Sequence, residues 1–211
     1  AKMLNRNLPE GVVFLNVGQS NFNDVIVHSL RTCKGLRIAV YVHDTIPLDW
    51  PEFQTPKSRQ AFRAFFDRVD RNADFVFCNS SDTRTRVLSY ARHLTADRVR
   101  VILPGLPDIR VDAPPTGSWT GKPYFMAIGT IEPRKNVGFL LDVWKGFTGA
   151  TDPHLVLCGR RGWMNEDVFN RLDQSPPNVH ELPALSDQEM WGLLEQSNGL
   201  LFPSLAEGFG Y

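Results

Sequence analysis

Glu207 is the strongest candidate for a ligand-binding residue, because it stands beside Gly208 and Gly210 near the end of the chain. The preceding apolar run, residues 200–202, predicts a buried strand that Pro203 ends. Glycines have no Cβ, so a ligand can approach the backbone N–H groups of such a turn closely. Open α/β sheets bind ligands at the carboxyl ends of their parallel strands, where a carboxylate can accept hydrogen bonds from sugar hydroxyls. An ordinary loop with a helix-capping glutamate is the alternative interpretation.

A second candidate is the cationic segment Gly129-Thr-Ile-Glu-Pro-Arg-Lys-Asn136, which lies between a predicted strand and a predicted helix. Gly129 permits a tight turn, and Arg134 and Lys135 fall just before or within the first helical turn. Cations are normally unfavourable at a helix N-terminus, so this placement makes sense if an anion binds there. A diphosphate would meet the helix N–H groups and both cations at once. A solvated basic turn is the alternative.

Two weaker candidates also follow predicted strands. Gly159 and Arg160 come after the strand at residues 154–158 and repeat the arrangement of a glycine followed by a cation. His43 ends the strand at residues 36–42, and it would face a cleft from the opposite side. A solvated turn and a structural histidine are the respective alternatives.

Several catalytic motifs are missing from the sequence. It contains no G-x-x-x-x-G-K-[ST] phosphate loop, no G-x-G-x-x-G after a strand and no G-x-S-x-G nucleophile elbow. The second absence counts against a dinucleotide-dependent dehydrogenase. No D-x-D pair offers two carboxylates to a metal-bound nucleotide, and no Cys/His cluster has zinc spacing. The sequence therefore predicts no metal site.

The composition of the 211 residues is that of a soluble globular protein, with 42% hydrophobic residues, 22% charged residues and a net charge of zero. The neutral charge gives no reason to predict a nucleic-acid partner. Cys33, Cys78 and Cys158 are widely spaced and odd in number, which favours buried thiols in a reducing compartment over disulfides. The chain has no apolar run that could span a bilayer and no secretory signal pattern.

Strands and helices alternate along the whole chain, which predicts an α/β fold with parallel sheets and helices on both faces. The predicted strands are residues 12–15, 36–42, 74–78 and 99–103, and then 124–128, 154–158, 179–182 and 200–202. A Pro/Gly-rich connector separates the two sets. We therefore expect two Rossmann-like domains, residues 1–106 and 107–211, with a ligand-binding cleft between them.

Local signals predict where the helices begin. Pro47, Pro51 and Pro56 predict a long loop without regular helix after the second strand. The segment Asn79-Ser80-Ser81-Asp82 supplies N-cap candidates, and Ser186-Asp-Gln-Glu189 is a capping box.

In combination, these segments resemble the retaining GT-B glycosyltransferases of family GT4, the group that includes bacterial mannosyltransferases. The matching segments, in the family's order, are Val40-Tyr-Val-His-Asp-Thr-Ile-Pro47, Phe77-Cys-Asn-Ser80, Gly129-Thr-Ile-Glu-Pro-Arg-Lys-Asn136 and Glu207-Gly-Phe-Gly210. They are similar to the family's strand-His-Asp segment, its strand end before a capped helix, its diphosphate loop and its donor-sugar loop. The four together span most of the chain and are far more specific than any one of them.

The resemblance implies a GT-B architecture in which the second domain binds most of a nucleotide-sugar donor, without a cofactor or a bound metal. Lys135 would contact the donor diphosphate, Glu207 would bind the sugar hydroxyls, and His43 would lie at the reacting centre. The implied catalytic residues are His43, Arg134, Lys135 and Glu207, and the implied donor-binding residues are Gly129, Thr130, Arg134, Lys135, Gly159, Arg160, Glu207, Gly208, Phe209 and Gly210.

The chain departs from the family pattern in three places. Thr130 stands where many members have an arginine, and Arg134 would have to supply that charge. The family's second glutamate, which holds the nucleotide ribose, would lie beyond Tyr211, and the glycine-rich loop that opens the first domain is not found. We therefore expect a chain truncated at both ends relative to the family, and inactive on its own.

The leading functional hypothesis is a retaining glycosyltransferase that moves a hexose, mannose, from a GDP- or UDP-linked donor to a glycan or lipid-linked acceptor. Lys135 and Arg134 would stabilise the departing diphosphate. A sugar-nucleotide epimerase and a nucleotide-binding or scaffolding module without turnover are the alternatives. The predicted location is the cytoplasm, and basic helix faces leave a peripheral contact with the cytoplasmic membrane face open.

Overall fold

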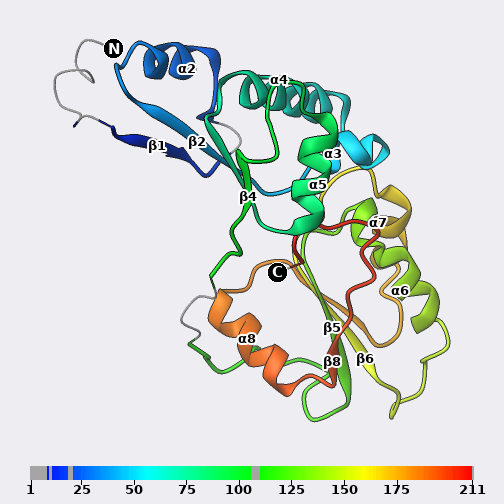
Figure 1. Cartoon of the computed structure of the whole chain (residues 1–211). Coiled ribbons are helices and arrows are strands. Elements are labelled where there is room, and N and C mark those ends of the chain that lie inside the picture. The colour runs from blue at the N-terminus through cyan, green and yellow to red at the C-terminus, as the bar shows by residue number, and fades with distance from the viewer. Residues whose placement is uncertain (1–8, 10, 19–20, 106–109, 211) are drawn as a thin grey trace. The chain divides into compact units, whose positions relative to one another are not determined.

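The computed structural model describes residues 9, 11–18, 21–105 and 110–210 (Figure 1). The chain divides into two compact units, one of Ala1–Gly105 with Glu207–Tyr211 and one of Leu106–Ala206. The break between Gly105 and Leu106 falls in the Pro/Gly-rich connector. The segment that begins at Glu207 groups with the first unit, whereas the sequence placed it in the second domain, and the contacts responsible are described below.

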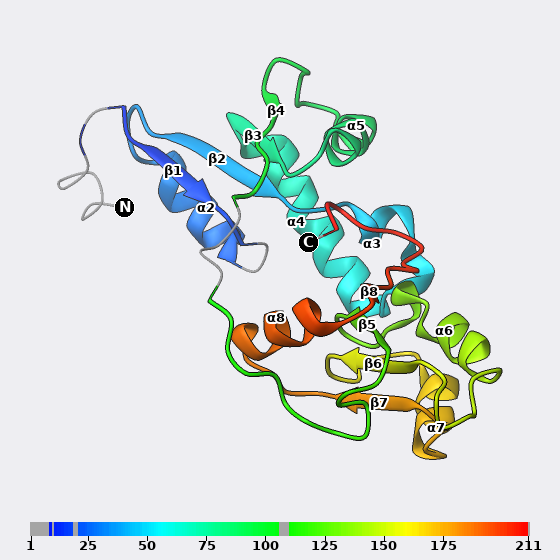
Figure 2. The same cartoon turned by 90° about the horizontal axis from the view of Figure 1, so that it is seen from below.

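The first unit contains a four-stranded parallel sheet of order β1-β2-β3-β4. Its strands are β1 (Val13–Asn16), β2 (Arg37–Val42), β3 (Phe75–Cys78) and β4 (Val99–Val101), and its longer helices are α2 (Asp24–Arg31), α4 (Pro56–Asn72) and α5 (Ser81–Tyr90). Val40 and Val76 of the sheet are fully buried in one cluster with Phe66 of α4. Seen from below, β1 and β2 lie in front of α2 and α4, so these helices pack on one face of the sheet (Figure 2).

The predicted loop after β2 was wrong, because two short helices form there: α3 (Ile46–Asp49) and η2 (Pro51–Phe53). Pro47 and Pro51 sit in the first turn of these helices, where a backbone N–H has no helical partner to lose. Pro56 is likewise the first residue of α4. The prolines of this segment therefore begin helices instead of preventing them.

The predicted helix caps are confirmed. The Ser80 hydroxyl accepts a hydrogen bond of 3.1 Å from the Thr83 backbone N–H at the start of α5. Ser186 and Glu189 form a complete capping box at the start of α8 (Asp187–Gln196). These caps satisfy backbone donors that the first helical turn leaves without partners.

The second unit contains a parallel sheet of order β7-β6-β5-β8. Its other elements are β5 (Tyr124–Ile128), η3 (Pro133–Lys135), α6 (Val137–Trp144), β6 (His154–Cys158), α7 (Glu166–Asp173), β7 (Val179–Leu182) and β8 (Gly199–Leu200). Leu155 packs with Leu141 of α6 and Leu172 of α7 in one buried cluster, whereas Val156 packs with Leu193 of α8 in another. Because successive strand residues face opposite sides, helices cover both faces of this sheet.

The order of this sheet reverses at β5. The chain passes from β5 to β6 and β7 on one side, and then returns to place β8 on the other side of β5. Ligands of open α/β sheets bind outside the carboxyl ends of the strands at such a reversal. The ends of β5 and β8 are therefore the expected place for a site in this unit.

A pair of neutral histidines sits elsewhere in the second unit and predicts a pH dependence of its stability. His154 Nδ1 lies 2.8 Å from His180 Nε2, and the His180 ring packs against Trp119. Burial, followed by the nearby His154, lowers the pKa of His180 from 6.5 to about 4. The unfolded chain therefore takes up this proton first, so the stabilisation is complete above about pH 6.5 and is lost progressively towards pH 4.

Urea unfolding at pH 7 and pH 5 checks this prediction. The urea concentration at the unfolding midpoint should be lower at pH 5 than at pH 7. This decrease should be smaller in His180→Gln, which keeps a hydrogen-bonding side chain but cannot titrate. An equal fall in both proteins would show that other groups cause the pH dependence.

Candidate functional site

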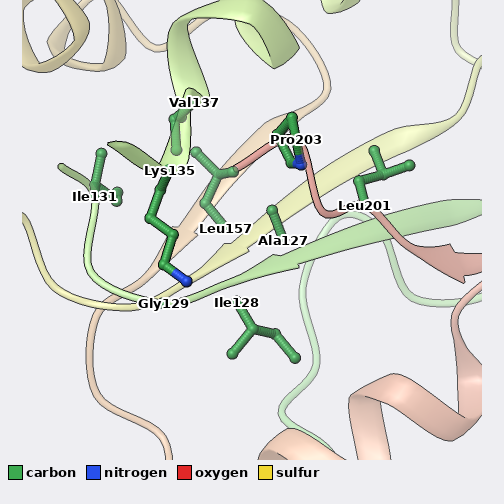
Figure 3. Close-up of a pocket in the computed structure, with 9 residues that line it drawn as sticks. All are labelled: Ala127, Ile128, Gly129, Ile131, Lys135, Val137, Leu157, Leu201 and Pro203. Atoms are coloured by element: carbon green, nitrogen blue, oxygen red, sulfur yellow. The ribbon is translucent and has the colours of Figure 1, made fainter. Parts of the chain in front are cut away.

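A pocket opens where the sheet order of the second unit reverses, at the carboxyl ends of β5 and β8 (Figure 3). It is lined by Ala127, Ile128, Gly129, Ile131, Lys135, Val137, Leu157, Leu201 and Pro203. Lys135 supplies the only ionisable side chain among these lining residues. In Figure 3 the Lys135 side chain runs from η3 down to the Gly129 turn, and its terminal nitrogen lies beside that turn.

Lys135 crosses the Gly129 turn because the glycine has no side chain. A Cβ built at Gly129 would lie 3.0 Å from Lys135 Cε and 3.4 Å from its Nζ, and the positive φ of Gly129, +127°, also favours glycine. The Nζ lies 5.0 Å from the centroid of the Phe202 ring, a cation–π contact. Gly129, Lys135 and the loop after β8 thus place a positive charge at the pocket.

The loops after β5 and β6 run side by side and extend the sheet. Gly129 N donates to Cys158 O at 2.9 Å, and Ile131 N donates to Arg160 O at 2.9 Å. A Cβ at Gly159 would lie 2.1 Å from Gly129 O. Gly159 was predicted to bind the donor, and the structure gives it a packing role that supports the Gly129 turn.

Glu132 and Arg134 form an ion pair that sequence reasoning missed. Glu132 is buried, and its Oε1 accepts from Arg134 Nη2 at 2.6 Å. A second guanidinium nitrogen donates to Ala206 O at 2.8 Å, and Arg134 O accepts from Leu205 N at 2.9 Å. The predicted anion ligand Arg134 therefore already has a carboxylate partner, and it ties the turn before α6 to the loop after β8.

Asn136 makes a further link between these two segments. It adopts the left-handed conformation with φ 54°, and its Nδ2 donates to Pro203 O at 3.3 Å. Asparagine is one of the few residues that enter this conformation readily. The residue type was thus a signal for a tight turn, although the sequence could not reveal its partner.

The other residues predicted in this unit lie on the surface. The Thr130 and Arg160 side chains are exposed, and Arg160 makes no side-chain hydrogen bond or ion pair within the residues that the structure describes. Its neighbour Arg161 is engaged by Glu181 and Asp173, at 2.7 Å each. Of these two adjacent cations, Arg160 is therefore the one with a side chain available to a ligand.

His43, in the first unit, follows the carboxyl end of β2. Its Nε2 lies 2.8 Å from Val17 O, and its ring lies 4.9 Å from that of Tyr41. A carbonyl oxygen can only accept, so Nε2 carries the proton in this contact. In the neutral ring Nδ1 then remains as a hydrogen-bond acceptor.

Residues 207–210 also belong to the first unit. Glu207 and Gly208 are partly buried, whereas Phe209 and Gly210 are exposed. A Cβ at Gly208 would lie 2.3 Å from His43 O, so the structure brings these two predicted residues together.

Three further observations concern the described residues only. They contain no group of three or more His, Cys, Asp or Glu side chains arranged to hold a metal ion. None of their helices is both long enough and apolar enough to cross a bilayer. Cys33, Cys78 and Cys158 are buried free thiols, as the sequence predicted.

Comparison with known sequences relates the chain to mannosyltransferases. The serotype-specific mannosyltransferase WbdA of Escherichia coli is 25% identical over 207 residues, which cover 87% of this chain and 25% of the relative. The O-antigen chain mannosyltransferase B of Escherichia coli is 30% identical over 97 residues, or 44% of this chain and 25% of the relative. The chain thus spans about a quarter of the length of these curated relatives. No protein-family model matches it.

Comparison with solved structures defines the fold. Anabaena Alr3699/HepE in complex with UDP and glucose superposes with a TM-score of 0.70 at 18% identity, covering 93% of this chain and 54% of HepE. WaaG, a glycosyltransferase involved in lipopolysaccharide biosynthesis, has a TM-score of 0.59 at 13% identity, covering 87% of this chain and 57% of WaaG. The predicted α/β fold class and the resemblance to GT-B glycosyltransferases are confirmed.

Proposed function

We propose that the chain is part of a retaining glycosyltransferase that transfers mannose from a nucleotide-diphosphate sugar to a glycan or lipid-linked acceptor. The observation that carries this proposal is the position of Lys135, whose ammonium group lies at the Gly129 turn where the sheet order reverses. The similarity to WbdA supports mannose, and the UDP bound in HepE supports a nucleotide-linked donor. The similarity to O-antigen mannosyltransferase B supports a glycan acceptor.

Lys135 is the proposed diphosphate ligand. A cation at that point stabilises the negative charge that develops as the nucleoside diphosphate departs. In this proposal the positive charge comes from Lys135 and not from a metal ion. Arg134 is reassigned from ligand to support, because Glu132 and Ala206 engage its guanidinium. Thr130 and Arg160 lie on the exposed loops beside the turn and are proposed to contact the donor.

The other proposed residues lie in the first unit. Glu207 would accept hydrogen bonds from the sugar hydroxyls, with the amides near Gly208, Phe209 and Gly210 assisting. His43 would stand at the reacting centre with Nδ1 as an acceptor. The cytoplasmic location and the peripheral membrane contact stay predictions from the sequence.

Substitution of Glu207 tests the sugar-reading role. In Glu207→Ala, binding of GDP-mannose or UDP-glucose should weaken roughly tenfold more than binding of GDP or UDP. The reason is that only the sugar-bearing ligands lose hydrogen bonds from their hydroxyls to the carboxylate. Isothermal titration of all four ligands measures this difference. Glu195→Ala, which removes an exposed carboxylate on α8, is the matched control. An equal loss for sugar-bearing and sugar-free ligands would contradict the role.

Product analysis separates the proposed reaction from the alternatives. With donor and acceptor glycan, a glycosyltransferase releases GDP or UDP and extends the acceptor. Conversion of the donor sugar without release of nucleoside diphosphate would identify an epimerase. Donor binding with neither product, in a protein that includes the flanking sequence, would favour a binding module.

A further inference from the structure

Two hydroxyl groups at the start of α5 hold the backbone of the Glu207–Gly210 turn. Ser80 Oγ donates to Gly208 O at 2.7 Å, and Thr83 Oγ1 lies 3.3 Å from the same oxygen. The two hydroxyls are also 3.0 Å apart. Segments 125 or more residues apart in the sequence are thereby joined through one carbonyl group.

The Ser80 hydroxyl can serve the turn and the helix at the same time. It has one proton and two lone pairs, so it donates to Gly208 O while it accepts from Thr83 N at 3.1 Å. Thr83 Oγ1 can then direct its proton to Ser80 Oγ or to Gly208 O. Capping of α5 accounts for the accepted bond only, which leaves the donated bond to Gly208 without a role in the helix.

Steric fit defines the same position. A Cβ built at Gly208 would lie 2.3 Å from His43 O, 2.8 Å from Asp44 Cβ and 3.3 Å from Asn79 Nδ2. Real Cβ atoms do not approach other atoms so closely, so Gly208 is pressed against the ends of β2 and β3. The carbonyl of Gly208 is therefore fixed by hydrogen bonds from α5 and by close packing on the loop after β2.

We propose that Ser80, assisted by Thr83, is a positioning residue for donor-sugar recognition by Glu207. This inference rests on the proposed function, in which Glu207 binds the sugar hydroxyls. Adjacent Cα atoms are about 3.8 Å apart across a trans peptide, so fixing Gly208 restricts where the Glu207 side chain starts. A binding carboxylate must be held within about 0.5 Å of its productive position, and a mobile turn would not achieve that.

A pair of isosteric substitutions at Ser80 separates positioning from helix capping. Asp and Asn are both good N-caps, about equal to Ser, so Ser80→Asp and Ser80→Asn should both preserve α5. Only Asn can donate a hydrogen bond to Gly208 O, because an ionised Asp is an acceptor alone. Thr83→Val removes the second hydroxyl, and Thr85→Val is its control, because Thr85 Oγ1 bonds Ser81 O within α5.

Hydrogen exchange reports on the turn without any ligand. We expect faster amide exchange at residues 207–210 in Ser80→Asp than in Ser80→Asn, with equal exchange along α5 in both. We also expect Ser80→Asp to weaken GDP-mannose or UDP-glucose binding roughly fivefold to tenfold more than it weakens GDP or UDP binding. Ser80→Asn should remain close to the unsubstituted protein in both measurements.

The outcomes distinguish this inference from the proposed function. Equal exchange at residues 207–210 in the Asp and Asn variants would overturn the positioning role. So would faster exchange in Ser80→Asp without a loss of donor-sugar affinity, if Glu207→Ala does lose that affinity. If Glu207→Ala also binds donor and nucleoside diphosphate as before, the sugar-reading function itself fails, and the positioning role falls with it.

Discussion

Replacement of Glu132 by alanine should lower the free energy of unfolding of the second unit by about 3–5 kcal/mol, the usual cost of removing one partner of a buried ion pair. The Glu132 and Arg134 side chains are only 4% and 14% exposed, and their charged groups are 2.6 Å apart. Removal of the carboxylate leaves a guanidinium in a site that excludes most water. Ala206 O, which accepts a hydrogen bond from the same guanidinium, carries no net charge.

Urea unfolding followed by tryptophan fluorescence measures this effect. Trp119, Trp144, Trp163 and Trp191 lie in the second unit and only Trp50 in the first, so the signal reports mainly on the second unit. Asp142→Ala is the control, because its side chain is 58% exposed and its pairs with Lys145 and Arg171 should contribute no more than about 1 kcal/mol. A similar small loss in Glu132→Ala would mean that Arg134 does not depend on Glu132.

Replacement of Lys135 by alanine should weaken binding of a nucleoside diphosphate by about 1.5–3 kcal/mol, the range for a hydrogen bond to a charged group. The expected effect is on binding, because the Lys135 ammonium lies at the pocket and Glu132 neutralises the neighbouring Arg134. Titration with GDP and UDP measures it. Lys145→Ala, at a side chain that is 70% exposed on the C-cap of α6, controls for the loss of one positive charge. Equal nucleotide affinities in Lys135→Ala and Lys145→Ala would contradict the assignment of Lys135 as a diphosphate ligand.

The alternation of apolar runs predicted the strands of both sheets except at the end of the second, where the expected buried strand at residues 200–202 is instead β8 (Gly199–Leu200), with Leu200 and Phe202 exposed. Strands such as β6, in which every residue is buried, read as short continuous apolar segments between helices, and the glycine and proline residues of the connector marked the boundary between units. The short helix α3 was missed because the rule that proline disrupts a helix does not apply to its first turn. For these prolines, the position within the helix therefore decides the backbone conformation more than the residue type alone.

The sequence predicted that a negative charge should meet the cations before α6. For Arg134 that charge is Glu132, a residue of the same turn. Nothing in the spacing reveals this pairing, because it depends on the tertiary contacts that bury Glu132 beside the loop after β8. Of these two cations, only Lys135 is still proposed as an anion ligand.

The structure groups residues 207–210 with the first unit, whereas the sequence placed them in the second domain. These residues follow β8 directly in the sequence, which suggested membership of the same unit. Gly208 instead contacts Ser80, Thr83 and His43 of the first unit. Hydrogen bonds to one carbonyl group and close packing at a glycine leave almost no pattern in a single sequence.

Hydrogen exchange of the chain with and without GDP or UDP tests the central proposal most directly, because it locates the bound nucleotide without requiring turnover. Binding of the diphosphate at Lys135 predicts slower amide exchange in residues 129–136 at saturating nucleotide, and the loss of this protection in Lys135→Ala. Binding that protects other segments of the second unit and leaves residues 129–136 unchanged would contradict it.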